Sequence, residues 1–159
     1  MNLKAKANMP RITPFLWFDH QAEEAANFYV SVFKQARILS VSRNEDGSAF
    51  SVSFELDSQE FIALNGGPAF TFTPAISFFV HCETQEEVDY YWDSLSEGGE
   101  VEQCGWLKDR YGISWQIVPN ILSELLADPD PVKAGRVNQA MLGMIKLDIS
   151  RLQAACDGK

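Results

Sequence analysis

One pattern occurs twice in this chain: an apolar stretch with strand composition, followed by an amphipathic helix. The segment EEAANFY at 23–29 matches EEVDYYW at 86–92, and the stretches FLWF and SFFV precede them. The apolar positions at helical spacing coincide in the two copies: Ala25, Phe28, Tyr29 and Val32 in the first, and Val88, Tyr91, Trp92 and Leu95 in the second. Chance similarity between two strand–helix units is the alternative, but the repeat favours two related halves.

Turn and cap residues divide each half into elements. In the first half we expect a strand at 12–18, a helix at 21–33 with Asp19 as its N-cap, and strands at 36–43, 48–57 and 61–65. In the second half we expect a strand at 75–82, a helix that begins at Thr84 in a capping box with Glu87 and ends at Gly98–Gly99, and strands at 100–108 and 113–119.

The segment after Pro119 has helical spacing instead. A short helix is expected at 121–126, a second beginning at Asp130–Pro131, and a third from Asp148 to 155. We therefore divide the chain into a flexible extension (1–11), a domain of two modules (12–119, with modules at 12–68 and 74–119) and a helical tail (120–159). The apolar stripe of the tail indicates that it packs on its own domain or on a partner subunit.

The composition excludes several classes of function. The formal net charge of −9 disfavours binding to nucleic acid or to an anionic membrane surface. No apolar run reaches the length of a membrane span. The three cysteines are widely spaced and form no CxxC pair, which is typical of a reducing cytoplasm.

Four stretches resemble a known family: WFDHQAEEAANFYVSVF from 17, AISFFVHCETQEEVDYYWDSLSEGGEV from 75, QCGWLKDRYGISWQIVP from 103, and DPDPVKAGRVNQAML from 128. They are similar to the PhnB-like branch of the glyoxalase/bleomycin-resistance/dioxygenase (vicinal oxygen chelate) superfamily, whose members often carry the name 3-demethylubiquinone-9 3-methyltransferase. The resemblance implies an α+β fold in which paired βαβββ modules form an incomplete barrel around a pocket, with a C-terminal helical tail. It also implies a homodimer and a small-molecule ligand.

Enzymes of the superfamily hold a divalent metal with one side chain from the first and last strand of each module. Matching the motifs carries these four positions onto Pro14, Ala63, Ala75 and Gln116. Only Gln116 has a donor atom in its side chain, and such metal sites need several imidazole or carboxylate ligands. We therefore expect no metal and no cofactor.

Strand alternation from these positions predicts the pocket lining. The expected residues are Leu16, Phe18, Phe61, Asn65, Ser77, Phe79, Cys104, Trp106, Lys108 and Gln116. An apolar, aromatic wall with a few polar groups is typical of a small-molecule site, and equally of an ordinary core. Cys104 is the weak candidate for a nucleophile, because no histidine accompanies it in the pattern.

Three functions remain open at this stage. The first is a protein that binds a small apolar or aromatic molecule in a metal-free pocket. The second is an enzyme acting on a quinone-like or aromatic substrate, with Cys104, Asn65 or Gln116 as polar participants. The third is a metal-dependent isomerase, lyase or dioxygenase, which the missing ligand set disfavours.

Overall fold

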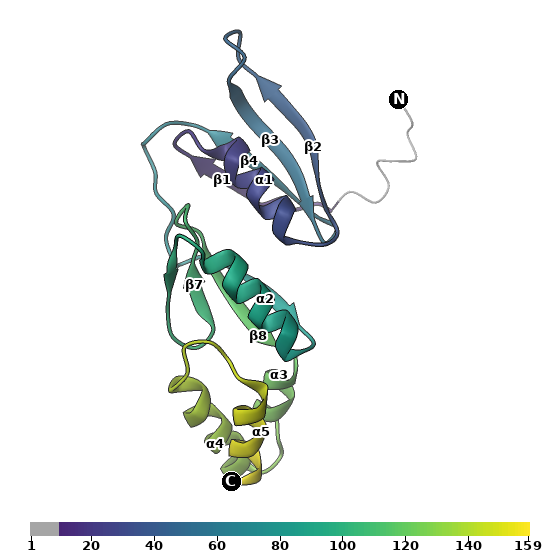
Figure 1. Cartoon of the computed structure of the whole chain (residues 1–159), viewed down its shortest axis with the longest axis vertical. Coiled ribbons are helices and arrows are strands. Elements are labelled where there is room, and N and C mark those ends of the chain that lie inside the picture. Colours follow the sequence, from purple (N-terminus) through teal and green to yellow (C-terminus); the bar gives the residue numbers. More distant parts are fainter. Residues whose placement is uncertain (1–9) are drawn as a thin grey trace. The chain divides into compact units, whose positions relative to one another are not determined.

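The chain folds into two compact units, one ending at Thr71 and one spanning Phe72–Lys159, in a computed structural model that describes residues 10–159. Each unit contains a strand, a helix and three further strands in that order (Figure 1). The expected α+β class, with two βαβββ modules and C-terminal helices, is confirmed. The expected extension at 1–11 falls, except for Pro10 and Arg11, outside the described residues.

The first unit is a four-stranded sheet covered by one helix. Its elements are β1 (Phe15–Phe18), α1 (Ala22–Val32), β2 (Ala36–Arg43), β3 (Ala49–Leu56) and β4 (Gln59–Asn65), in the sheet order β1-β4-β3-β2 with β1 parallel to β4. Tyr29 of α1 stacks on Phe54 of β3, which stacks on Phe61 of β4 with ring centroids 5.3 Å apart. The aromatic residues of the helix and of the sheet thus form one core.

The second unit repeats this topology. Its elements are β5 (Ser77–Cys82), α2 (Gln85–Ser96), β6 (Glu100–Val101), β7 (Trp106–Lys108) and β8 (Ser114–Pro119), in the order β5-β8-β7-β6 with β5 parallel to β8. Thr84 Oγ1 accepts a hydrogen bond from the Glu87 amide, as the capping-box spacing predicts. Gly98 follows the helix with φ of 76°, a conformation that glycine adopts without strain.

Three helices complete the second unit: α3 (Ile121–Leu126), α4 (Pro131–Leu142) and α5 (Ile149–Asp157). They share a core with the last strand of the sheet, formed by Val118, Leu122, Val137, Met144, Leu147, Leu152 and Cys156. Asp130 and Asp148 cap α4 and α5 through bonds from the amides of Val132 and Arg151. The tail therefore packs on its own unit.

Within residues 10–159, every helix is too short or too polar to cross a lipid bilayer.

Two predicted element boundaries are wrong. β1 begins at Phe15 rather than at residue 12. The N-cap of α1 is Gln21 rather than Asp19, and it makes no side-chain cap bond. Instead the Ala22 amide donates to Oδ1 of Asn65 in β4, 2.8 Å away. A residue distant in sequence therefore satisfies the free amide at the start of the helix.

The predicted strand at 100–108 is also wrong, because the chain turns inside it. Cys104 and Gly105 both have positive φ, 59° and 82°, and β6 pairs antiparallel with β7 across this turn. A Cβ at Gly105 would lie 2.9 Å from the Ile117 carbonyl oxygen, so only glycine fits there. Cys104 consequently belongs to a turn, where strand alternation does not apply.

Candidate functional site

The second sheet has one face against α2 and one face that is partly open. Val80, Cys82 and Ile117 are buried together with the apolar residues of α2. Alternation places Phe79 and Gln116 on the opposite face, where the Phe79 side chain keeps 47% exposure. Because Phe79 is exposed to solvent, small molecules can reach this face of the sheet.

A cavity of about 320 Å³ lies on this face. It is lined by nine residues from the sheet, the β6–β7 turn and the tail: Phe79, Cys104, Trp106, Gln116, Val118, Leu122, Ser123, Leu126 and Met141. None of these nine side chains carries a formal charge. The volume lies at the lower end of the range typical of small-molecule pockets.

Three neighbouring strands each contribute one residue to the centre of the cavity wall. Phe79 of β5 is the register partner of Gln116 in β8, which is the register partner of Trp106 in β7. Gln116 Nε2 donates to Ser77 Oγ over 2.9 Å, and this bond orients the amide. The Gln116 amide also carries a carbonyl oxygen, which is an acceptor for a ligand donor, and the register partners of Gln116 on either side are the aromatic residues Phe79 and Trp106.

Cys104 enters the cavity from the turn between β6 and β7. The Cys104 amide donates to the Met144 carbonyl, 2.8 Å away, and the Gly105 amide donates to the Ile145 carbonyl. These bonds tie the turn to the tail and place the half-buried Cys104 side chain in the wall. Lys108 is not part of the lining, and its ammonium lies 3.8 Å from the carboxylate of Glu100.

In the first unit the face assignment from sequence is wrong by one residue. Leu16, Phe18 and Phe61 are buried on the sheet face that α1 covers. Asn65 links the start of α1 to the Ala49 carbonyl through its amide group. These four residues therefore form the helix-packed core, and we omit them from the candidate site.

The error has a simple cause in the loop lengths. Three residues, Asp19, His20 and Gln21, separate β1 from α1, whereas only Glu83 and Thr84 separate β5 from α2. Aligning the two halves on their helices therefore shifts the strands by one residue, which exchanges the two faces of a strand. Counted from the strand ends, the partners Phe15 and Ile62 correspond to the partners Phe79 and Gln116.

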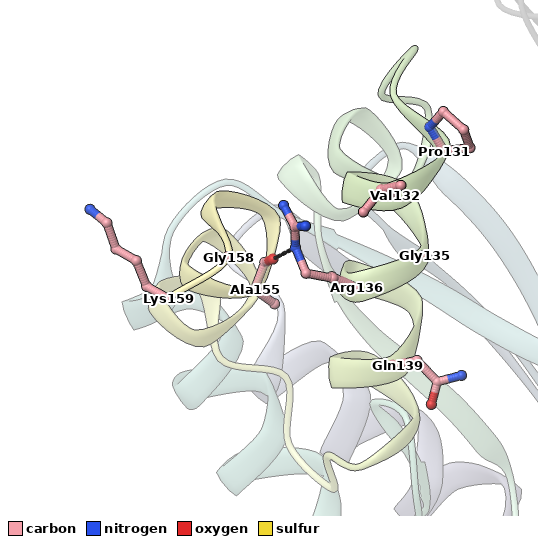
Figure 2. Close-up of a pocket in the computed structure, with 8 residues that line it drawn as sticks. All are labelled: Pro131, Val132, Gly135, Arg136, Gln139, Ala155, Gly158 and Lys159. Carbon is pink, nitrogen blue, oxygen red and sulfur yellow. Dashed lines mark hydrogen bonds between the residues drawn. The ribbon is translucent and has the colours of Figure 1, made fainter.

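A second, larger cavity of about 680 Å³ lies between α4 and α5 (Figure 2). Arg136 and Lys159 are its charged lining residues, and Nε and Nη2 of the Arg136 guanidinium already donate to the carbonyls of Ala155 and Cys156. Arg136 thus satisfies the last carbonyls of α5, so this groove is explained by helix packing. The cavity on the sheet remains the better candidate.

The topology and the sequence both match known proteins. The family model for 3-demethylubiquinone-9 3-methyltransferase matches residues 10–118. A PhnB protein of the same description from Bacillus cereus is 39% identical; the match covers 69% of this chain and 99% of that one, with a TM-score of 0.66. The chain belongs to the 3-demethylubiquinone-9 3-methyltransferase family. It is a PhnB-like member of the vicinal oxygen chelate superfamily, as the resemblance predicted.

More distant structures share the fold of this PhnB-like chain. Protein PA1353 from Pseudomonas aeruginosa is 18% identical over 70% of this chain and 98% of its own, with a TM-score of 0.57. The fosfomycin resistance protein FosX from Listeria monocytogenes is 14% identical over 73% and 97%, with a TM-score of 0.50. The comparison with curated proteins finds no match.

The donor set of this PhnB-like chain does not fit the metal of its superfamily. On the corrected face of the first unit the positions are Phe15 and Ile62. In the second unit Ala75 lies before β5, and the register partners on its face are Phe79 and Gln116. These side chains supply a single neutral amide oxygen. Within residues 10–159, no three His, Cys, Asp or Glu side chains are grouped as a metal ion would require. We therefore derive no chemical step through a metal at this site.

The structure brings together part of the predicted pocket. Phe79, Cys104, Trp106 and Gln116 line one cavity, and Ser77 is hydrogen-bonded to its edge. Sequence reasoning missed Val118, Leu122, Ser123, Leu126 and Met141. Val118 follows Gln116 by two residues on β8, so alternation could have found it. Met141 belongs to an apolar stripe at helical spacing, which also describes residues that only pack, such as the buried Met144.

Proposed function

We propose that this PhnB-like chain binds a small, neutral, aromatic or apolar molecule in the cavity of the second unit. The observation that carries the proposal is the lining, because nine uncharged residues surround about 320 Å³. A buried ionic group on a ligand would find no counter-charge there. Burying such an unpaired charge costs on the order of several kcal/mol. The net charge of −9 adds to the cost for an anion.

The polar groups of the wall suggest how a neutral ligand is oriented. The Gln116 side chain donates to Ser77 through its nitrogen, and its carbonyl oxygen is an acceptor that a ligand donor can use; Phe79 and Trp106 are the register neighbours of Gln116 on the two flanking strands. A ligand with one aromatic ring system and one hydrogen-bond donor complements this arrangement.

Methyl transfer, which the family description names, finds less support in this cavity. The usual methyl donor, S-adenosylmethionine, carries a sulfonium, an ammonium and a carboxylate group. The nine lining residues offer no charged partner for any of them. An enzyme acting on a quinone-like substrate through Cys104 remains the alternative, but no lining residue is a base that would activate the thiol.

The test uses two dyes that differ by one charged group. N-phenyl-1-naphthylamine is neutral, and 8-anilinonaphthalene-1-sulfonate is the same skeleton with a sulfonate. We expect the neutral dye to bind with one site per chain, and at least about tenfold more tightly than the sulfonate. Phe79→Ala should weaken the neutral dye, whereas Phe50→Ala, an exposed aromatic of the first unit, should not. Equal binding of the two dyes, or no effect of Phe79→Ala, would refute the proposal.

We also propose that the chain is a cytoplasmic homodimer with the domain limits expected from sequence. Exposed apolar side chains support a second copy, among them Phe15, Phe70 and Ile76 with exposures of 57%, 64% and 74%. The three free cysteines are consistent with a reducing compartment. Light scattering coupled to size-exclusion chromatography tests the dimer; a mass of one chain, 17.8 kDa, at all concentrations would contradict it.

A further inference from the structure

The lining of the cavity comes from two sources. Five residues, Phe79, Cys104, Trp106, Gln116 and Val118, lie within the part of the chain that matches the family model. The match ends at residue 118, and the other four, Leu122, Ser123, Leu126 and Met141, belong to the tail. The match with the 39% identical relative covers 99% of that chain but only 69% of this one. The tail wall therefore lies outside the segment that the family model matches.

The tail is held to the sheet and to α2 by residues 144–149, which follow the wall residue Met141. The Gln85 amide group donates to the Leu147 carbonyl and accepts from the Ile149 amide over 2.8 Å. Lys146 Nζ lies 2.8 Å from Asp89 of α2. On the other side, the Met144 and Ile145 carbonyls accept from the β6–β7 turn. Because this part of the tail is bonded both to α2 and to the β6–β7 turn, it limits the size of a ligand that can enter the cavity.

Two side chains of this wall, Leu126 and Met141, are less constrained by the core than Leu122 is. Leu122 is buried at 6% exposure and belongs to the tail core, so its size is set by packing. Leu126 keeps 36% exposure, and Met141 is partly buried at the edge of the core. Methionine is flexible and adapts to irregular neighbours. The volume that remains for a ligand thus depends chiefly on Leu126 and Met141.

We propose that Leu126 and Met141 are specificity-determining residues, which set the upper size of the neutral aromatic ligand that the sheet face binds. This inference rests on the proposed function, since it assumes that the same cavity is the binding site. The tail converts an open sheet face into a cavity of limited volume. Ligands up to about the size of N-phenyl-1-naphthylamine fit beside Phe79 and Trp106, and larger ones collide with the tail.

The experiment compares a small and a large neutral probe, 1-naphthol and N-phenyl-1-naphthylamine, by calorimetry on the full chain. Met141→Trp and Leu126→Trp should each weaken the large probe by about tenfold, because the added ring fills the cavity, and the small probe by less than about threefold. Met141→Ala should strengthen the large probe relative to the small one, because it enlarges the cavity. Val132→Trp is the matched control, because Val132 is 62% exposed on α4 and lines the other groove (Figure 2).

The outcomes separate the two proposals. Suppose that Phe79→Ala abolishes binding but both tryptophan variants keep the wild-type size preference. This result overturns the role of the tail and leaves the proposed binding function intact. A wild-type chain that binds neither probe overturns both. Circular dichroism confirms folding of each variant, and the partly exposed Leu126 position keeps the test valid should Met141→Trp unfold.

Discussion

The three cysteines occupy very different surroundings. Cys82 is fully buried beneath α2, and burial, with a smaller contribution from the Glu87 carboxylate, raises the pKa of its thiol to about 12. Cys156 is buried in the tail, whereas the half-buried Cys104 lines the cavity. Because only the thiolate reacts with alkylating reagents, access and ionisation together determine which cysteine is modified.

We predict that Cys104 is the cysteine modified first in the native protein at about pH 8. Iodoacetamide labelling followed by peptide mass spectrometry should find Cys104 modified and Cys82 protected. Cys104→Ser should remove the fast phase of labelling, and N-phenyl-1-naphthylamine should slow it by occupying the cavity. Preferential labelling of Cys82 would show that the second sheet is open on its α2 side.

Cys82 also makes the stability depend on pH. Its ordinary pKa is 9.0 and its pKa in the folded chain is about 12, so between these values the unfolded chain releases a proton that the folded chain keeps. The free energy of unfolding is therefore expected to fall as the pH rises above about 9. The urea midpoint of the wild type should fall between about pH 8 and about pH 10, and this fall should be smaller in Cys82→Ala. An identical decrease in both proteins would contradict this origin.

Asp109 organises the turn before β8. Its buried carboxylate accepts hydrogen bonds from the amides of Tyr111 and Ile113 and from the Trp115 indole, which is 2.8 Å away. We predict that Asp109→Ala destabilises the protein by about 3 kcal/mol, because buried donors lose their acceptor. Asp46→Ala is the matched control, since Asp46 accepts from Ser48 in an exposed turn. Its cost in urea unfolding should be much smaller than that of Asp109→Ala, because water replaces the lost acceptor in an exposed turn.

At the scale of elements, the tail depends on a few contacts with α2. Gln85 stands in the first turn of α2 and bonds both the Leu147 carbonyl and the Ile149 amide, just where α5 begins. One amide side chain thus satisfies two backbone groups of the connecting segment. The neighbouring Asp89–Lys146 pair is solvent-exposed and contributes less.

We predict that Gln85→Leu loosens the tail at a cost of about 1–3 kcal/mol. Hydrogen exchange should rise in residues 143–157 and remain unchanged in the first unit. Gln139→Leu, an exposed change on α4, should leave exchange as in the wild type. A uniform rise throughout the chain would indicate global destabilisation and not local release of the tail.

At the scale of the whole molecule, the same module occurs twice but its two open faces differ. In the second unit the tail covers part of the face and creates a cavity, with Gln116 as the amide at its centre. In the first unit the equivalent partners are Phe15 and Ile62, which are both apolar. The two units thus share one architecture but differ in the residues at the centre of their open faces.

We predict that added divalent metal leaves the protein unaffected. Elemental analysis after purification without a chelator should find less than about 0.1 equivalents of Ni, Zn, Mn or Fe per chain. The melting temperature should not change when these ions are added. Stoichiometric metal that is lost in Gln116→Ala would overturn this prediction and the proposed function with it.

The sequence by itself determined the elements and their order, because local chemistry sets them. The helix caps at Thr84, Asp130 and Asp148, the left-handed Gly98 and the repeated apolar stripe act over a few residues. The strand positions matched to the metal ligands carry no imidazole or carboxylate on either face. Phe79, Trp106 and Gln116 were found because alternation was applied to the correct face in the second half.

The tertiary structure alone decided which faces are open and what covers them. One additional residue between β1 and α1 reverses the face of a strand, and this effect has no local signature. The turn at Cys104 and Gly105 is stabilised by carbonyls of Met144 and Ile145, some forty residues away in the chain. The tail wall likewise forms through contacts distant in sequence, which helical periodicity cannot distinguish from ordinary packing.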